Sequence, residues 1–178
     1  MKKCLLGFVV AAGLSMGFTA CTDLEPTLYS NLTTANAYTS ESDIDAALVG
    51  IYADLNPYPG DAWMYYAGYM VMTTDYTTDM GYSTAAGDPT KLSNMTYDAN
   101  NRYFKYNWQC MYQVISNANV LLQNIDNISM DETKKKQVIA QAKFLRALAY
   151  RDLTDGWGPV PLITELIDPS TAKNMPLT

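Results

Sequence analysis

The sequence predicts a mainly α-helical fold in which tetratricopeptide-like helical hairpins are joined by one long irregular loop. Two apolar runs at helical spacing, 102–127 and 129–155, follow each other with only a few polar residues between them. A third such run follows a capping sequence that begins at Ser40. Residues 73–101 lack this spacing and are rich in Thr, Asp, Asn, Gly, Ser and Tyr, which is typical of a loop.

The first predicted helix covers about 40–55. Ser40-Glu-Ser-Asp43 is a capping box, in which the first and fourth residues satisfy each other's backbone amides. The apolar residues that follow recur every three or four positions. Asn56-Pro57 ends the helix, because the residue before a proline disfavours helical backbone. A second helix is predicted over about 62–74, with Trp63, Tyr66 and Met70 on one side.

The third and fourth predicted helices form an antiparallel hairpin. The third, 102–127, carries an apolar stripe whose members are spaced alternately by four and three: Phe104, Trp108, Met111, Ile115, Ala118, Leu122 and Ile125. The fourth begins with a capping box at 129–132 and is expected to end near Asp155, with Gly156 as its cap. Its apolar residues, Phe144 among them, lie on nearly all sides, which predicts burial against partners beyond those in this chain.

Composition excludes several classes of function. The chain has 178 residues, a formal net charge of -6 and no histidine. Ser-His-Asp and Cys-His catalysis and histidine-ligated metal sites are therefore excluded. An acidic chain without a basic block is a poor nucleic-acid binder, because affinity for phosphate comes mainly from Lys and Arg. We expect no cofactor, no metal site and no nucleic-acid partner.

The N-terminus is typical of an exported lipoprotein. A basic start, with Lys2 and Lys3, precedes an uncharged apolar run from Leu5 to Phe18, as in a secretory signal peptide. Phe18-Thr-Ala-Cys21 resembles a bacterial lipobox, in which the cysteine is acylated and becomes the new N-terminus. We therefore predict a signal peptide over 1–20, lipidation at Cys21 and a lipidated tether over 21–39.

Three segments resemble a known family. They are residues 40–55, residues 112–122 and, most specifically, AQAKFLRALAYRDLTDGWGPVPLIT at 140–164. Together with the lipobox, they are similar to the SusD/RagB family of surface glycan-binding lipoproteins from Bacteroidota. The resemblance covers only the N-terminal part of the family pattern. It therefore implies that 40–178 is the helical N-terminal part of a truncated, incomplete SusD-like fold.

The resemblance implies a non-enzymatic role in nutrient uptake. Such a protein is lipid-anchored in the outer membrane and faces outward. It captures oligosaccharides and delivers them to a partner TonB-dependent (SusC-like) transporter. Two alternatives stay open: a structural lid or adaptor of the transporter, and a peptide-binding uptake protein, because tetratricopeptide-like grooves bind peptides.

The candidate glycan-binding residues lie in the loop and at the start of the third helix. Sugar recognition uses flat aromatic faces and planar polar groups, and residues 58–112 hold ten of the 14 tyrosines and two of the three tryptophans. Family members place sugar contacts just before the third helix. The corresponding candidates here are Asp75, Tyr76, Asp79, Tyr82, Tyr97, Asn100, Asn101, Arg102 and Tyr103.

Other residues favour structural interpretations. Trp63 and Trp108 lie on apolar stripes and are predicted to be core residues. Lys143, Arg146 and Asp152 lie in the specific block and are predicted to pair within or beside the helical core, not to catalyse. A glycoside hydrolase needs two carboxylates about 5–10 Å apart. Asp75 and Asp79 are one such possible pair, but any chain with 18 acidic residues offers similar pairs.

Overall fold

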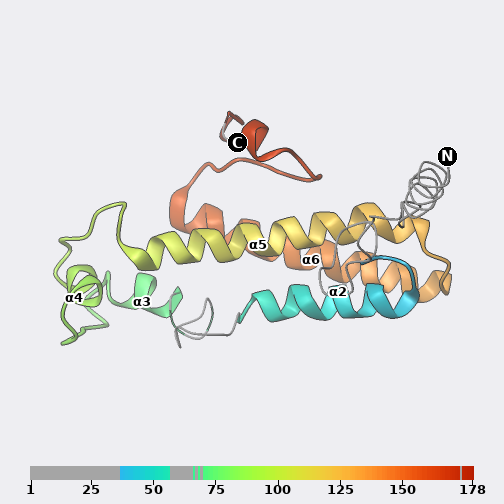
Figure 1. Ribbon diagram of the computed structural model, residues 1–178. Coiled ribbons are helices and arrows are strands. Elements are labelled where there is room, and N and C mark those ends of the chain that lie inside the picture. The colour runs from blue at the N-terminus through green and yellow to red at the C-terminus, as the bar shows by residue number, and fades with distance from the viewer. Residues whose placement is uncertain (1–36, 57–65, 67, 69, 173) are drawn as a thin grey trace, which may run out of the picture. The chain divides into compact units, whose positions relative to one another are not determined.

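The computed structural model describes residues 37–56, 66, 68, 70–172 and 174–178. The predicted signal peptide, Cys21, Trp63 and most of the tether lie outside these residues. The described helices are α2 (Glu41–Asp54), α3 (Met70–Asp75), α4 (Asp88–Ser93), α5 (Arg102–Asn124), the 3-10 helix η2 (Ile125–Asn127), α6 (Glu132–Trp157) and α7 (Pro169–Ala172). Figure 1 shows α5 and α6 side by side with α2 along them. The mainly helical prediction is confirmed.

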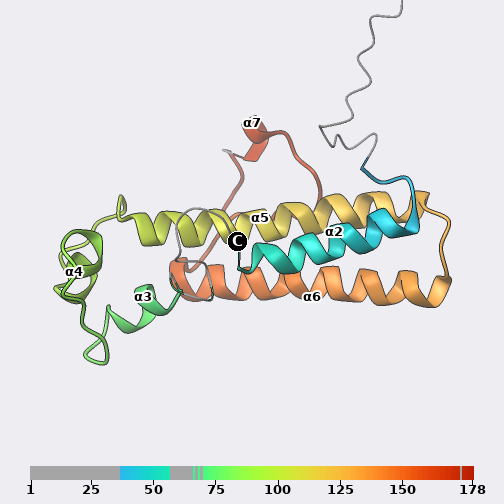
Figure 2. The same ribbon diagram turned by 60° about the horizontal axis from the view of Figure 1, so that its bottom comes forward.

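The core lies where α2, α5 and α6 meet. Its buried members include Ile44, Leu48 and Ile51 from α2, Met111, Val114, Ile115, Ala118 and Leu121 from α5, and Val138, Ala142, Leu145, Ala149 and Leu153 from α6. The α2 helix runs in the same direction as α6: Lys134 Nζ lies 2.6 Å from carboxylate oxygens of both Glu41 and Asp45, and the Tyr52 hydroxyl donates to Gln141 Oε1 at 3.0 Å. Figure 2 shows this three-helix arrangement from a second direction.

The ends of α6 differ from the prediction. Its N-cap is Asp131, whose carboxylate accepts a hydrogen bond from the Lys134 amide at 2.8 Å, so the predicted Ser129 cap is wrong. The helix continues to Trp157 and is capped by Gly158, which has a φ of 73°. Gly156 lies inside the helix. Glycine adopts this left-handed conformation with little strain, so the second glycine of the Gly-Trp-Gly sequence terminates the helix.

Within the described part of the chain, α6 is not covered on all sides, which fits the prediction that it needs further partners. Phe144 is 63% exposed, whereas its neighbour Leu145 is 1% exposed. The reason is geometric: α2 and α5 pack against one side of α6, and in the described part of the chain Phe144 lies on another side. An apolar residue in a helical stripe is therefore buried only where a neighbouring element covers it.

The capping box at the start of α2 is confirmed. Asp43 Oδ2 accepts hydrogen bonds from the Ser40 amide at 2.8 Å and the Thr39 amide at 3.0 Å, and the Ser40 side chain accepts from the Asp43 amide. The Thr39 hydroxyl donates to the same carboxylate at 2.8 Å. This hydrogen bond, followed by those from the Thr39 amide and Ser40, lowers the pKa of Asp43 to about 2.

In acid, the fold should lose the stabilisation that the charged Asp43 side chain provides. The folded pKa of Asp43 is below its ordinary value of 3.8, so the charged form stabilises the fold above that value. The stabilisation is lost as the pH falls from about 4 to about 2. We expect Asp43→Asn to lower the melting temperature at pH 6 and to have a smaller effect at pH 2.5, measured by circular dichroism. An equal loss at both pH values would contradict this assignment.

The segment predicted as one long loop contains a short helix. The α4 helix, with Pro89 in its first turn, is joined to the start of α5 through Asp88. The backbone carbonyl of Asp88 accepts a hydrogen bond from Asn101 Nδ2 at 3.2 Å, and the Asp88 carboxylate accepts one from the Arg102 amide at 3.3 Å. Leu92 of α4 and Tyr103 of α5 are buried together. These contacts fix the loop against the N-terminal end of α5.

Candidate functional site

A continuous row of aromatic rings links the loop, α5 and α6. Its six members, the aromatic row, are Tyr97, Phe104, Trp157, Trp108, Tyr112 and Tyr150. Ring centroids are 5.1 Å apart for Tyr97 and Phe104, 6.4 Å for Phe104 and Trp157, and 5.5 Å for Trp157 and Trp108. The tilted and edge-to-face angles are those that aromatic quadrupoles favour. The rings therefore hold one another in place.

The Tyr112 and Tyr150 end of the row has a structural role. The Tyr112 hydroxyl donates to the Pro161 carbonyl at 2.8 Å. The Tyr150 hydroxyl donates to the Ile163 carbonyl at 3.0 Å and accepts from the Ile163 amide at 2.6 Å. Burial raises the pKa of Tyr112 to about 12 and raises that of Tyr150, so both phenols stay protonated near neutral pH.

These tyrosines hold residues 160–166, the C-terminal strap, against the hairpin. Asn119 Nδ2 donates to the carbonyls of Ile163 at 3.0 Å and Glu165 at 3.4 Å. Arg146 Nη1 donates to Asn119 Oδ1 at 2.6 Å and to the Thr164 carbonyl at 3.0 Å. The strap lies on the side of α5 and α6 that is opposite α2 (Figure 1). The structural interpretation of Arg146 fits these contacts.

The other end of the row borders two hollows, which together we call the aromatic cleft. The larger has a volume of about 580 Å³, and its lining includes Tyr97, Asp98, Phe104, Lys105, Trp108, Gln109 and Trp157. The second has a volume of about 400 Å³, and its lining includes Met70, Thr73, Thr77, Asn107, Asp152 and Asp155. Tyr97, Phe104, Gly156 and Trp157 border both hollows.

Polar contacts hold the walls of the second hollow. Asn107 Nδ2 donates to Thr73 Oγ1 at 2.9 Å, which joins α5 to α3. The side chain of Asp152 is fully buried, accepts from the Tyr66 hydroxyl at 2.6 Å and pairs with Arg151. Asp98, Lys105, Gln109 and Asp155 stand exposed at the rim. Rigid rings with carboxylate and amide groups beside them can cover the apolar face of a flat ligand and bind its hydroxyl groups.

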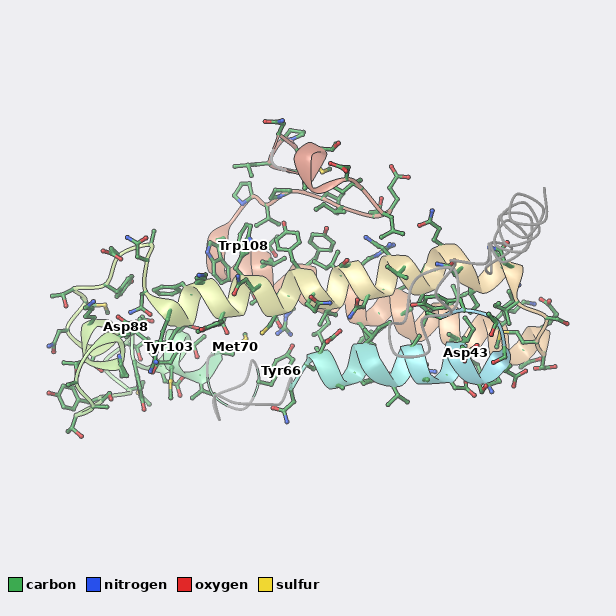
Figure 3. The ribbon with its side chains drawn as sticks, viewed as in Figure 1. Asp43, Tyr66, Met70, Asp88, Tyr103 and Trp108 are labelled. Carbon is green, nitrogen blue, oxygen red and sulfur yellow. The ribbon has the colours of Figure 1, made fainter. Side chains whose placement is uncertain are left out.

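The structure separates the predicted site residues into three groups. Tyr97 lines the aromatic cleft. Asn101 and Tyr103 are each 2% exposed: Asn101 caps α5, and Tyr103 packs against Leu92 with Arg102 over its ring. Asp75, Tyr76, Asp79, Tyr82, Asn100 and Arg102 line neither hollow. Figure 3 shows Tyr103 and Trp108 on different sides of α5.

One cleft residue, Trp108, is predicted from the sequence to be a core residue. Trp108 is half-buried and lines the larger hollow, although its stripe predicts core. One signal was available: the stripe is aromatic at Phe104 and Trp108 and aliphatic from Met111 onward. In this helix the aromatic part of the stripe borders the cleft, and the aliphatic part lies in the core.

The fold and the site together define a class of protein. It is a helical-hairpin protein with an aromatic cleft at one end of the hairpin. The chain matches the SusD-like family, described as "Starch-binding associating with outer membrane", over residues 24–177. It therefore belongs to that family. SusD-like proteins have a tetratricopeptide-like helical fold and are associated with the cell surface or outer membrane. Among the described residues, no helix combines the length and apolarity needed to cross a membrane.

Individual relatives agree with this assignment. SusD-like protein P2 of Formosa agariphila is 28% identical over 92% of this chain, and SusD-like protein P25 of the same organism is 31% identical over 72%. A SusD-like carbohydrate-binding protein from Bacteroides fragilis superposes with a TM-score of 0.63 at 28% identity, covering 79% of this chain and 28% of its own. A laminarin-binding SusD-like protein superposes with a TM-score of 0.61 at 31% identity, covering 75% of this chain and 29% of its own. The chain spans 31% and 25% of the two Formosa proteins.

Proposed function

We propose that the protein binds an oligosaccharide in the aromatic cleft. The observation that carries this proposal is the aromatic row, which ends in two hollows bordered by Tyr97, Phe104 and Trp157 and rimmed by polar side chains. Volumes of about 580 and 400 Å³ lie in the range of small-ligand sites. Membership of a family described as starch-binding, and the likeness to a laminarin-binding protein, support the same ligand class.

The wider role follows from the family and the N-terminus. As part of an outward-facing lipoprotein anchored through Cys21, the protein passes oligosaccharides to a TonB-dependent (SusC-like) transporter without cleaving them. The family's outer-membrane association and the lipobox-like sequence support this role. The anchor is tested by labelling cells with a fatty-acid analogue: Cys21→Ser should abolish labelling, whereas Cys110→Ser should retain it.

A free peptide is a less suitable ligand for the face of the hairpin beside Tyr112 and Tyr150. The C-terminal strap already occupies that face, and the side chains of Asn119, Arg146 and Tyr150 are engaged with its main chain. A peptide that paired with the same side chains would have to displace these contacts. A hollow of about 380 Å³, lined mainly by apolar side chains such as Trp108, Tyr112 and Ile115, stays open beside the strap. The aromatic cleft carries charged and amide groups beside its rings, which favours it as the sugar site.

Two tyrosines of the loop provide a matched test of the cleft. Tyr97 stacks on Phe104 and lines the cleft, whereas Tyr82 is 68% exposed and lines neither hollow. We expect Tyr97→Ala to weaken oligosaccharide binding by at least about tenfold, because it removes an aromatic wall. Tyr82→Ala should leave affinity within about twofold. The measurement is calorimetry with the full chain and neutral gluco-, xylo- and manno-hexasaccharides.

The outcomes separate the candidate functions. Equal losses in both tyrosine variants would place binding outside the cleft. No binding of any hexasaccharide by the wild-type chain, together with co-purification of a TonB-dependent transporter, would favour the structural lid. Release of reducing ends above a heat-killed control would establish hydrolysis and overturn the non-enzymatic assignment.

A further inference from the structure

The charged groups that line the aromatic cleft are mostly acidic. Among the described residues that line the two hollows, Asp98, Asp152 and Asp155 contribute carboxylates, and Lys105 is the single lysine or arginine. Asp98 and Lys105 belong to the larger hollow, and the other two carboxylates belong to the second. When Arg151, which pairs with Asp152, is counted as well, these groups carry one more negative than positive charge.

The arginine that contacts the cleft carboxylates, Arg151, is already engaged. Arg151 pairs with the fully buried carboxylate of Asp152, and its Nε lies 3.9 Å from Asp155 Oδ2. These two contacts direct the guanidinium toward carboxylates of α6. A uronate or sulfate group is bound best by an arginine fork that is free to form two parallel hydrogen bonds. To recruit Arg151, such a group would have to compete with a buried aspartate.

Resting on the proposed function, we propose that the cleft selects uncharged oligosaccharides and that Asp98 and Asp155 are specificity-determining residues. A carboxylate accepts hydrogen bonds from sugar hydroxyl groups, so it can bind a neutral glycan. The same carboxylate repels a uronate or a sulfate, which adds a penalty against the wrong ligand. The aromatic walls contact both kinds of sugar equally, so the rim supplies the discrimination.

Ligand pairs that differ only in charge test this proposal. Calorimetry with the full chain in 20 mM NaCl would compare a β-1,3-gluco-hexasaccharide with its monosulfated derivative, and hexagalacturonate with its methyl ester. Where the protein binds either member of a pair, we expect the uncharged member to bind at least about fivefold more tightly than the charged one. In 500 mM NaCl this preference should shrink, because salt screens exposed charges.

Variants assign the preference to the rim. Asp98→Asn combined with Asp155→Asn should reduce the ratio of neutral to charged affinity by about fivefold. The matched control is Asp126→Asn, which makes the same charge change in η2, outside the lining of either hollow, at a side chain that is 81% exposed. That variant should leave the ratio unchanged.

Three results would overturn the inference. Charged members that bind as tightly as neutral ones would overturn it while leaving glycan binding intact. The inference would also be overturned if the ratio of neutral to charged affinity were unchanged in the Asp98→Asn and Asp155→Asn double variant. Failure of every oligosaccharide to bind would overturn the proposed function and this inference together.

Discussion

Leu145→Ala is expected to lower the free energy of unfolding by about 3 kcal/mol. Leu145 is 1% exposed and packs in the core shared by α2, α5 and α6. Truncation removes buried apolar surface and leaves a cavity in a region where three helices meet, so the surrounding backbone has little freedom to collapse into it. Urea denaturation followed by far-UV circular dichroism measures the loss.

The adjacent residue supplies the control. Phe144 is the larger side chain but is 63% exposed. Phe144→Ala should therefore change stability by no more than about 0.5 kcal/mol. A loss at Phe144 as large as that at Leu145 would contradict the packing of α6 described here, since it would require an element that covers Phe144.

Asn119→Ala is expected to lower the free energy of unfolding by about 2–3 kcal/mol and to release the C-terminal strap. Asn119 is 2% exposed, and its side chain joins Arg146 to the carbonyls of Ile163 and Glu165. Its removal deletes one hydrogen bond from each of these partners, although Arg146 keeps its bond to the Thr164 carbonyl and the Ile163 carbonyl keeps its bond from the Tyr150 hydroxyl. A network of this kind costs more to interrupt than one isolated bond.

Two measurements test this prediction. Denaturation gives the loss of stability, and limited proteolysis reports whether 160–166 becomes cleavable. Asn124→Ala is the matched control, because Asn124 Nδ2 donates to the Val120 carbonyl within its own helix. Faster cleavage of the strap in both variants, or in neither, would contradict the role assigned to Asn119.

Local signals in the sequence predicted the helices well. The capping box at Ser40 and the apolar stripe of α5 depend on neighbours within a few residues, so both are visible in the sequence. The end of α6 was misplaced by two residues because two glycines flank Trp157 and either can serve as a cap. The exposure of Phe144 could not be read from periodicity alone, because it depends on which elements cover the helix.

The candidate site was harder to predict. The enrichment of tyrosine in 58–112 indicates the correct region, and Tyr97 is a candidate that lines the cleft. Trp157 is 60 residues away from Tyr97 in the sequence and joins it only because α6 returns antiparallel along α5. Tyr103 and Tyr97 look equivalent as sequence, but the hydrophobic contact with Leu92 buries Tyr103. Contacts between residues far apart in the sequence thus determine which aromatic residues are accessible to a ligand.

The way in which the strap is held has a consequence for labelling. The hairpin side chains bind its main-chain carbonyls, which every residue type provides. Leu162 and Thr164 are exposed between these contacts. Either side chain can therefore be replaced by a spectroscopic label while the backbone keeps its course. Such a label would report release of the strap without removing any of the hydrogen bonds that hold it.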